Sequence, residues 1–429
     1  MNEGARTFLH ELFRTAVAAA HPATCLRPFL PPPPSGRLIL LAAGKAAGSM
    51  MEIAEQHYLQ SGLPKERLLG LGVTRRGYAR PTQHTRMAEA GHPVPDQTGI
   101  DATEQTLALA DQAGVDDLVL VLLSGGASAN WIAPAKGLTL ADKQAATRAL
   151  LRSGATIGEI NTVRKHLSRI KGGRLAARAQ PARVVTLAIS DVPGDDPDVI
   201  GSGPTVPDLS TLSAARGVID RHRLEMPASV VSALSDAANE TPKPDDPIFH
   251  NVEFSLVARP ADAFHAVKEA AKNAGYDCVF LGDQVEGEAR EVAQEHARIA
   301  RELHAQGRRA VLLSGGELTV TLQKQGGRGG PNQEYALSLA IRLEGIHGIT
   351  ALAADTDGTD GGSGSATDPA GAFADGSSAA RGRILGLDPA SFLANNNSTE
   401  FFAPLGDLLM SGPTFTNVND FRAIVVDSA

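Results

Sequence analysis

The chain has 429 residues, of which 42% are hydrophobic and 21% are charged, and its formal net charge is −8. This composition is that of a globular protein of two or three domains, and it excludes a disordered or fibrous chain. Lys and Arg residues form no long run, and no window holds the roughly 18 to 20 apolar residues that cross a bilayer, so we expect neither nucleic-acid binding nor a membrane span. Cys25 and Cys278 cannot form a disulfide framework, which favours a cytoplasmic location.

An apolar stripe over residues 8–17 predicts a surface helix as the first element, rather than a secretion signal. Short apolar runs then recur between helical stretches, which is typical of buried parallel strands in an α/β protein. The clearest runs are residues 37–44, 68–74, 117–126, 184–191, 310–316 and 349–358. Each run ends in small or acidic residues, at the strand ends where open parallel sheets bind ligands.

A cluster of prolines and acidic residues at 238–251 interrupts this alternation and indicates a domain boundary. We therefore predict two α/β domains around a cleft, over residues 1–240 and 241–429. The first should be Rossmann-like with a largely parallel sheet, and the second should hold a smaller α/β sheet. The last strand-like run, residues 421–427, could belong to either sheet.

The stretch AAGKAAGSM, residues 42–50, follows a predicted strand and opens a helix. Lys45 should therefore lie near a helix N-terminus, where free N–H groups and the helix dipole favour an anion. Ile39 and Ala46 stand where a Walker A loop requires Gly and Ser or Thr, and the dinucleotide pattern G-x-G-x-x-G is absent. A solvent-facing lysine in a tight turn is the alternative.

The sequence Leu-Leu-Ser-Gly-Gly occurs twice, at residues 122–126 and 312–316. A Gly-Gly pair lets backbone amides approach an anion, although a plain turn is the alternative. The candidate binding residues are Ser124, Gly125, Gly126, Ala127 and Ser128 in the first copy and Ser314, Gly315, Gly316 and Glu317 in the second. The residues after the motif differ between the two copies. This favours the same local structure, a strand that ends in a Gly-Gly turn, at two places rather than a duplicated domain. We expect the two copies to face one cleft, one serving the substrate and the other the nucleotide.

Acidic residues follow two of the predicted strands. Asp191 stands at the end of one strand, and Asp355 and Asp357 stand at the end of another. Such carboxylates suit Mg²⁺, which takes one or two of them together with phosphate oxygens. The second loop, residues 353–368, is not a calcium loop, because Asp360 replaces its invariant Gly. A solvated loop is the alternative there.

Basic side chains concentrate in residues 161–176, on a predicted helix that ends or breaks at a Gly-Gly pair, and Arg328 lies between two Gly pairs in residues 326–334. In an acidic protein such clusters need acidic neighbours or an anionic ligand. The candidate binding residues are Asn161, Arg164, Lys171, Gly172 and Gly173 in the first stretch and Arg328, Asn332 and Glu334 in the second. His92 is expected to brace a loop.

The motifs GKAAG, HPVPD, LLSGGASA, NTVRKHLSRIKGGRLA, SDVPGDDPDVIGSGPT, LSGGELTV, GGRGGPNQE, DTDGTDG and SGPTFTNVND together resemble those of the glycerate 2-kinase family with a C-terminal MOFRL domain. The resemblance runs in order over nearly the whole chain. It implies Mg²⁺-dependent transfer of the γ-phosphoryl group of ATP to the 2-hydroxyl of D-glycerate, giving 2-phosphoglycerate and ADP. The expected partners are these small molecules, and a homo-oligomer is left open.

The resemblance also points to Lys45 and an arginine near Asn-Gln-Glu as charge-stabilising groups that face each other across the cleft. Many relatives have Arg directly before Asn-Gln-Glu, where this chain has Pro331, so that role falls to Arg328 or is absent. Asp191 is expected to bind Mg²⁺ or to act as the base for the glycerate hydroxyl. Relatives are often labelled hydroxypyruvate reductases, so an NAD(P)H-dependent reductase is the alternative function, and a sugar-acid-responsive binding protein is a third.

Overall fold

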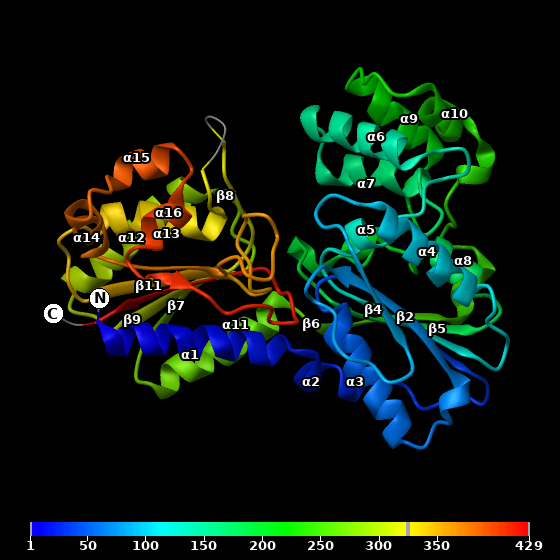
Figure 1. The fold of residues 1–429 in the computed structure, drawn as a ribbon, viewed down its shortest axis with the longest axis horizontal. Coiled ribbons are helices and arrows are strands. Elements are labelled where there is room, and N and C mark those ends of the chain that lie inside the picture. The colour runs from blue at the N-terminus through cyan, green and yellow to red at the C-terminus, as the bar shows by residue number, and fades with distance from the viewer. Residues whose placement is uncertain (1, 323–326, 428–429) are drawn as a thin grey trace. The chain divides into compact units, whose positions relative to one another are not determined.

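The computed structural model describes residues 2–322 and 327–427, in two compact units. Unit 1 comprises Met1–Thr24 and Ala258–Ala429, and unit 2 comprises Cys25–Val257. The first helix, α1 (Glu3–Ala20), therefore lies with the C-terminal part of the chain, whereas the sequence grouped it with residues 1–240. The reason is its apolar stripe, which packs on α11 (Pro260–Asn273) and brings the Phe13 ring within 5.9 Å of the Phe421 ring (Figure 1).

Unit 2 contains a six-stranded sheet in the order β3-β2-β1-β4-β5-β6. Its strands are β1 (Leu38–Ala43), β2 (Leu68–Arg75), β3 (Arg86–Ala90), β4 (Leu118–Leu123), β5 (Arg183–Ile189) and β6 (Val252–Ala258). The pairings of β1 with β2, β1 with β4, β2 with β3 and β4 with β5 are all parallel. The strand order reverses between β1 and β4, and in open α/β sheets such a switch point is where ligands bind.

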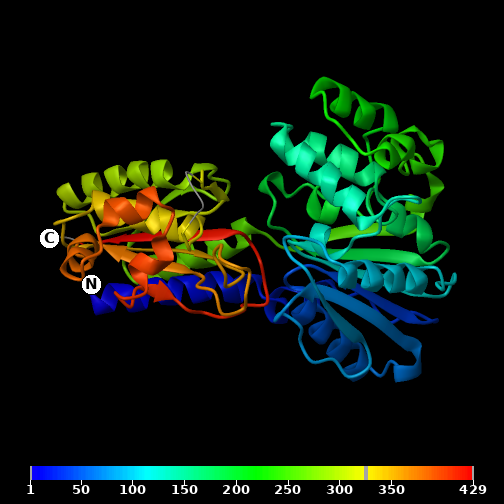
Figure 2. The same cartoon turned by 45° about the horizontal axis from the view of Figure 1, so that its top comes forward.

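The helices of unit 2 form two groups. The helices are α3 (Ala47–Gln60), α4 (Gln97–Ala110), α5 (Ala127–Asn130), α6 (Leu140–Arg152), α7 (Ile157–His166), α8 (Arg174–Arg178), α9 (Leu212–Arg221) and α10 (Ala228–Ser235), and the short helix α2 (Pro22–Cys25) spans the boundary between the two units. Four of them, α6, α7, α9 and α10, bury a core of their own and form a separate group, which we call the helical layer (Figures 1 and 2). Unit 2 therefore has a second hydrophobic core, in the helical layer, in addition to the core of its sheet.

Unit 1 also contains six strands in one sheet, in the order β13-β12-β11-β14-β9-β7. The strands are β7 (Asp277–Gly282), β9 (Ala310–Ser314), β11 (Ile349–Asp355), β12 (Gly371–Asp375), β13 (Leu408–Leu409) and β14 (Asp420–Val426). The expectation of parallel strands is wrong here, because β14 runs antiparallel to both β9 and β11. Those two strands still run in the same direction, so their carboxyl ends share one edge of the sheet. The last strand-like run of the sequence belongs to this sheet.

Helices cover both faces of the unit 1 sheet, with α1 and α11 on one face and α12 and α13 on the other (Figures 1 and 2). The remaining elements of unit 1 are β8 (Gly287–Glu288), α12 (Ala289–Ala305), β10 (Leu318–Thr319), α13 (Pro331–Arg342), α14 (Ser378–Ile384), α15 (Pro389–Ala394) and α16 (Ser398–Phe402). Among the described residues, no helix is both long and apolar enough to cross a bilayer.

Glu55 ties the helix α3 to the segment that leads into the edge strand β3. Its side chain is buried, and its carboxylate accepts hydrogen bonds from the backbone N–H groups of Gln83, His84 and Thr85 at 2.6, 2.8 and 2.7 Å. The substitution Glu55→Gln turns an amide NH₂ toward one of these donors. We expect it to lower the free energy of unfolding by about 1 to 3 kcal/mol, measured by urea denaturation.

The matched control is Glu52→Gln, one turn earlier on the same helix. Glu52 makes a partly exposed ion pair with Arg80 at 2.8 Å, and such pairs contribute at most about 1 kcal/mol. Equal losses of stability in the two variants would contradict the structural role of Glu55.

Candidate active site

The loops after β1 and β4 meet at the switch point of the unit 2 sheet. The backbone N–H of Lys45 donates to the carbonyl oxygen of Gly125 at 2.8 Å, and the N–H of Ala46 donates to Ser124 Oγ at 2.9 Å. A Cβ on Gly44 would lie 2.4 Å from the Ser124 carbonyl oxygen, so only glycine fits at that position. The two loops therefore hold Lys45 beside Ser124, Gly125 and Gly126. The sequence predicts each group at a strand end, but it does not predict that the two groups are neighbours.

The first Ser-Gly-Gly turn leaves donors free for an anion. Gly126 adopts a left-handed φ of 84°, and α5 begins directly after it. Among the described residues, the backbone N–H groups of Gly125 and Gly126 have no hydrogen-bond partner, whereas the N–H of Ala127 donates to the carbonyl oxygen of Ser124 at 3.2 Å. Two free amides next to a lysine form the kind of concave donor site that binds phosphate or carboxylate.

A cavity of about 480 Å³, which we call the unit 2 pocket, lies where the helical layer meets these loops. Its lining residues are His92, Pro93, Val94, Pro95, Gly126, Ser128, Ala129, Ile132, Lys143, Gln144, Thr147, Arg148, Leu151, Arg164 and Lys171. Four residues predicted from the sequence, Gly126, Ser128, Arg164 and Lys171, thus line one cavity. The lining contains no Asp or Glu.

Two cations of the pocket, Lys143 and Lys171, are withdrawn from water. Lys143 is 6% exposed and donates to the Leu167 carbonyl oxygen at 3.1 Å, and Lys171 is 2% exposed and donates to the Ser128 carbonyl oxygen at 3.1 Å. Burial, together with the nearby positive charges of Arg164 and Arg169, lowers the pKa of Lys143 to about 7. Burial, with Lys143 and Arg164 as neighbours, lowers the pKa of Lys171 well below its ordinary value. An anion would relieve this cost.

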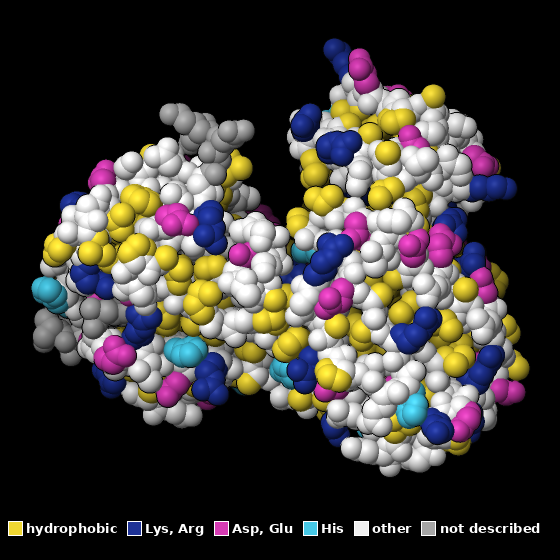
Figure 3. Space-filling model, viewed as in Figure 1, with side chains coloured by type: hydrophobic (Ala, Val, Ile, Leu, Met, Phe, Trp, Pro, Cys, Tyr) yellow, Lys and Arg dark blue, Asp and Glu magenta, His cyan; other side chains and the backbone are white. Residues whose placement is uncertain are grey.

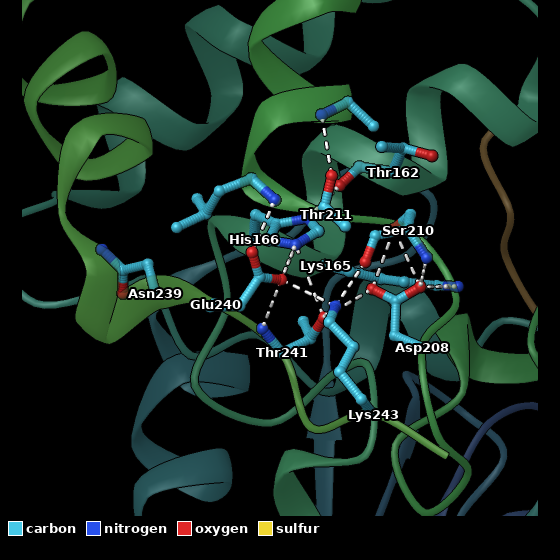
Figure 4. A network of polar contacts seen from close by, with 12 residues as sticks. Thr162, Lys165, His166, Asp208, Ser210, Thr211, Asn239, Glu240, Thr241 and Lys243 are labelled. Carbon is cyan, nitrogen blue, oxygen red and sulfur yellow. Dashed lines mark hydrogen bonds and ion pairs between the residues drawn. The ribbon is translucent and has the colours of Figure 1, made fainter. Parts of the chain in front are cut away.

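A buried polar network fixes the end of α7 behind the pocket (Figure 4). Lys165, the neighbour of Arg164 in the chain, forms an ion pair with Asp198 and lies 3.4 Å from Asp208. The ring of His166 bonds to the Thr162 carbonyl oxygen at 2.8 Å through Nδ1. Its Nε2 lies 3.1 Å from Glu240 Oε1. These contacts hold the helix that presents Arg164.

The structure corrects the expected course of residues 161–176. The helix α7 ends at His166, five residues before Lys171, and α8 begins at Arg174. The N–H groups of Gly172 and Gly173 donate to the carbonyl oxygens of Ser202 and Gly203 at 3.0 and 2.8 Å, so these amides are already bonded within the protein. Asn161 is buried on α7 and does not line the pocket.

The second Leu-Leu-Ser-Gly-Gly copy forms a different turn, in unit 1. The N–H of Gly315 donates to the Gly282 carbonyl oxygen at 2.8 Å, and Ser314 Oγ accepts from Arg422 Nε at 3.2 Å. A Cβ on Gly316 would lie 2.2 Å from the backbone nitrogen of Val285, and Glu317 is exposed. The expectation that both copies expose their amides is therefore wrong for Gly315. The expectation that the two copies face one cleft stays a prediction.

Most polar groups at the start of α13 are bonded to their neighbours. The buried carboxylate of Asp360 accepts from the N–H groups of Asn332 and Gln333 at 3.0 and 2.8 Å, and burial raises the pKa of Asp360 to about 7. Glu334 forms an ion pair with Arg290 at 2.6 Å. These contacts stabilise the helix start, and a role of Asn332 or Glu334 in ligand binding stays a prediction.

Arg328 precedes α13 and pairs with Glu400 at 3.1 Å, with its side chain 65% exposed. Pro331 is the first residue of α13, where its missing N–H costs nothing. The first residue of the stretch 326–334, Gly326, lies outside the described residues. The catalytic role of Arg328 therefore stays a prediction.

The carboxylates predicted to bind Mg²⁺ lie in both units. Asp191 is half-buried and follows β5. The Asp355 carboxylate accepts a hydrogen bond from the N–H of Asp357 at 2.8 Å. The carboxylate of Asp357, which is buried, accepts a hydrogen bond from the N–H of Thr359 at 2.8 Å. No group of three or more His, Cys, Asp or Glu side chains in the described part of the chain could hold a metal ion. A Mg²⁺ site here would consist of one or two carboxylates and the phosphate oxygens of a ligand.

Sequence reasoning missed the contribution of α6 to the pocket. Lys143, Thr147 and Leu151 lie four residues apart and line the pocket from one face of this helix. The sequence of α6 gave no sign of a ligand site apart from Lys143, which is followed at intervals of four residues by Thr147 and Leu151. His92, expected to brace a loop, also lines the pocket, and its Nε2 lies 3.0 Å from where a Cβ on Gly126 would be.

Comparison with known proteins agrees with this architecture. Residues 8–235 match a family described as a domain of unknown function (DUF4147), and residues 310–420 match the MOFRL family. The D-glycerate 2-kinase of Thermotoga maritima is 42% identical over 415 residues, covering 96% of this chain and 95% of that protein. A protein of Agrobacterium vitis provisionally named hydroxypyruvate reductase is 46% identical over 427 residues, covering 98% and 94%.

The crystal structure of glycerate kinase from Thermotoga maritima matches with a TM-score of 0.85 and 41% identity, covering 99% of this chain and all of that one. These similarities extend over both units and are far above the level at which only a fold is shared. The chain therefore belongs to the glycerate 2-kinase family with a C-terminal MOFRL region.

Proposed function

We propose that this chain is a glycerate 2-kinase, which transfers the γ-phosphoryl group of ATP to the 2-hydroxyl of D-glycerate and yields 2-phosphoglycerate and ADP. The observation that carries the proposal is the 42% identity to D-glycerate 2-kinase of Thermotoga maritima over 96% of the chain. The strand-end site of unit 2 supports it chemically. Phosphoryl transfer depends on positioning and on cationic charge, both of which this site offers, rather than on a covalent nucleophile.

Lys45 is the residue we assign to charge stabilisation at the transferring phosphoryl group. Its backbone N–H is fixed to Gly125, and its Cγ lies 3.3 Å from where a Cβ on Gly126 would be. The lysine and the free amides of the Gly-Gly turn thus belong to one rigid arrangement. Donors that are held in place before the reaction stabilise developing charge without reorganising, which is the most effective use of such groups.

Mg²⁺, when bound, would offset phosphate charge and help to orient the reacting groups. The chain's donors fit this ion, because strand-end carboxylates with phosphate oxygens are its usual ligands. One or two of Asp191, Asp355 and Asp357 would fill this role. Asp191 and Asp355 are half-buried and can reach a ligand, whereas Asp357 is 1% exposed and already accepts from Thr359.

A cytoplasmic location is part of the proposal and is supported by the two cysteines, Cys25 and Cys278, neither of which forms a disulfide. A hydroxypyruvate reductase is the second candidate, favoured by the name of the Agrobacterium vitis relative. The loop after β1 opposes it, because it lacks the glycine pattern that holds a dinucleotide. In addition, β2 ends in Arg75, where a dinucleotide site would have an Asp or Glu that binds the ribose. The guanidinium of Arg75 lies over the Tyr78 ring, 3.8 Å from its centroid.

The decisive assay combines the protein with ATP, Mg²⁺ and D-glycerate and identifies the product. We expect glycerate-dependent release of ADP together with 2-phosphoglycerate. A parallel reaction with hydroxypyruvate and NADH or NADPH should leave the nicotinamide absorbance unchanged. Oxidation of the nicotinamide without any formation of ADP would make the reductase the correct function.

Lys45→Ala should lower kcat by roughly 10² to 10³, because it removes one preorganised cation from the transition state. The measurement is steady-state ADP release with saturating ATP and glycerate. The control is Lys65→Ala, an exposed lysine in the turn before β2, which should keep the wild-type rate. Near-normal turnover of Lys45→Ala would refute this role.

Asp191→Asn should raise the Mg²⁺ concentration needed for half-maximal activity, because an amide is a weaker ligand than a carboxylate for this hard cation. A rise of about tenfold corresponds to the loss of roughly 1.4 kcal/mol of metal binding. Asp220→Asn, an exposed carboxylate on α9, is the control and should leave the Mg²⁺ dependence unchanged. An unaltered Mg²⁺ titration of Asp191→Asn would rule out metal binding by Asp191.

A further inference from the structure

The unit 2 pocket concentrates positive charge without compensation. Its lining includes Lys143, Arg148, Arg164 and Lys171 and no carboxylate, in a chain whose net charge is −8. None of these four side chains forms an ion pair with another described residue. On the face of unit 2 that Figure 3 shows, by contrast, Lys and Arg side chains are interspersed with Asp and Glu. A single carboxylate would satisfy one of the pocket's cations, whereas a chain of phosphates offers charge to several of them.

The mouth of the pocket is apolar. Val94 and Leu151 line it although they are 66% and 62% exposed, and Ile132 lies buried next to them in the lining. Exposed apolar side chains at the edge of a polar cavity mark a place where an apolar part of a ligand packs. Gln144 Nε2 donates to the Pro95 carbonyl oxygen at 3.1 Å, which ties α6 to the loop that carries Val94.

The volume of the pocket also indicates which of the two substrates, ATP or glycerate, it binds. A volume of about 480 Å³ lies in the range of sites that enclose a whole cofactor or drug-sized ligand. A three-carbon acid would fill only a fraction of it. A nucleotide, with its charged phosphates and planar base, matches both the cationic interior and the apolar mouth.

We propose that the unit 2 pocket is the nucleotide site of the kinase. The phosphates of ATP contact Lys143, Arg164 and Lys171, and the base packs on Val94 and Leu151. Glycerate then binds outside this pocket. This assignment rests on the proposed function, because it takes ATP to be the phosphoryl donor.

The protonation of Lys143 gives the assignment a pH signature. Its pKa is about 7, so the side chain loses its charge as the pH rises through neutrality. The charged side chains that act on it are Arg164 and Arg169, and the other titratable groups of the pocket lining are His92, Arg148 and Lys171, so none of these groups is an acid. Because a neutral lysine attracts phosphate less, nucleotide affinity should fall between about pH 6 and pH 8.

The test is calorimetric titration of the full-length protein with ADP and with a non-hydrolysable ATP analogue, in the absence of glycerate. Arg164→Gln should weaken binding roughly 10- to 100-fold, as expected for a lost charge-assisted contact. Leu151→Asp should weaken binding roughly tenfold, and because Leu151 is exposed this variant should fold normally. Lys143→Met should bind more weakly at about pH 6 and should lose most of the pH dependence of the wild type.

Two matched controls separate the pocket from its surroundings. Arg152→Gln changes an exposed arginine on the same helix as Leu151, and Ile157→Asp changes an apolar residue of similar exposure, 61%, on α7. Neither residue lines the pocket, so both variants should bind nucleotide as the wild type does.

Nucleotide affinity that is unchanged in all three pocket variants, or undetectable in the wild type, would overturn the assignment. An increased KM for glycerate with normal nucleotide affinity would also overturn it and would make the pocket the glycerate site. If the variants lose nucleotide binding but the wild type releases no ADP with glycerate, the pocket assignment holds and the proposed function fails.

Discussion

Lys143 and Lys171 are buried without a carboxylate partner, and this uncompensated positive charge determines what the site of unit 2 can bind. Removing an ammonium group from water is costly unless another charge compensates for it. Here the two lysines donate only to backbone carbonyl oxygens, which offset part of the cost. A protein that keeps such an arrangement gives up stability that a bound anion can restore, as functional sites commonly do. The pKa of each lysine is lowered because burial destabilises its charged, protonated form.

The fold supplies the rigid parts that this arrangement needs. The strands β1 and β4 are neighbours at the point where the strand order reverses, so their two terminal loops meet and hold Lys45 against the Gly-Gly turn. The helical layer covers this edge from another direction and brings in α6 and α7. The ion pairs of Lys165 with Asp198 and Asp208 anchor α7 from behind. The helix that carries Arg164 is thus held in position by contacts outside the site.

Local sequence signals predicted the strands and strand-end loops because those features depend on nearby residues. The six apolar runs are all strands, and Lys45 lies between β1 and the start of α3, as the predicted order of strand and helix requires. The direction of β14 and the bonding of the Gly315, Gly172 and Gly173 amides were not predictable, because each depends on partners far away in the chain. Lys143 was missed for the same reason, since nothing in α6 reveals that Leu167 and Arg164 lie beside it.

The uncompensated cations of unit 2 serve, in this proposal, to bind the phosphates of a nucleotide. A crystal structure of the protein with a non-hydrolysable ATP analogue would show this binding. We expect phosphate oxygens within hydrogen-bonding distance of Arg164 and Lys171, with the base against Leu151. A nucleotide bound elsewhere, with the unit 2 pocket empty or filled by glycerate, would contradict it.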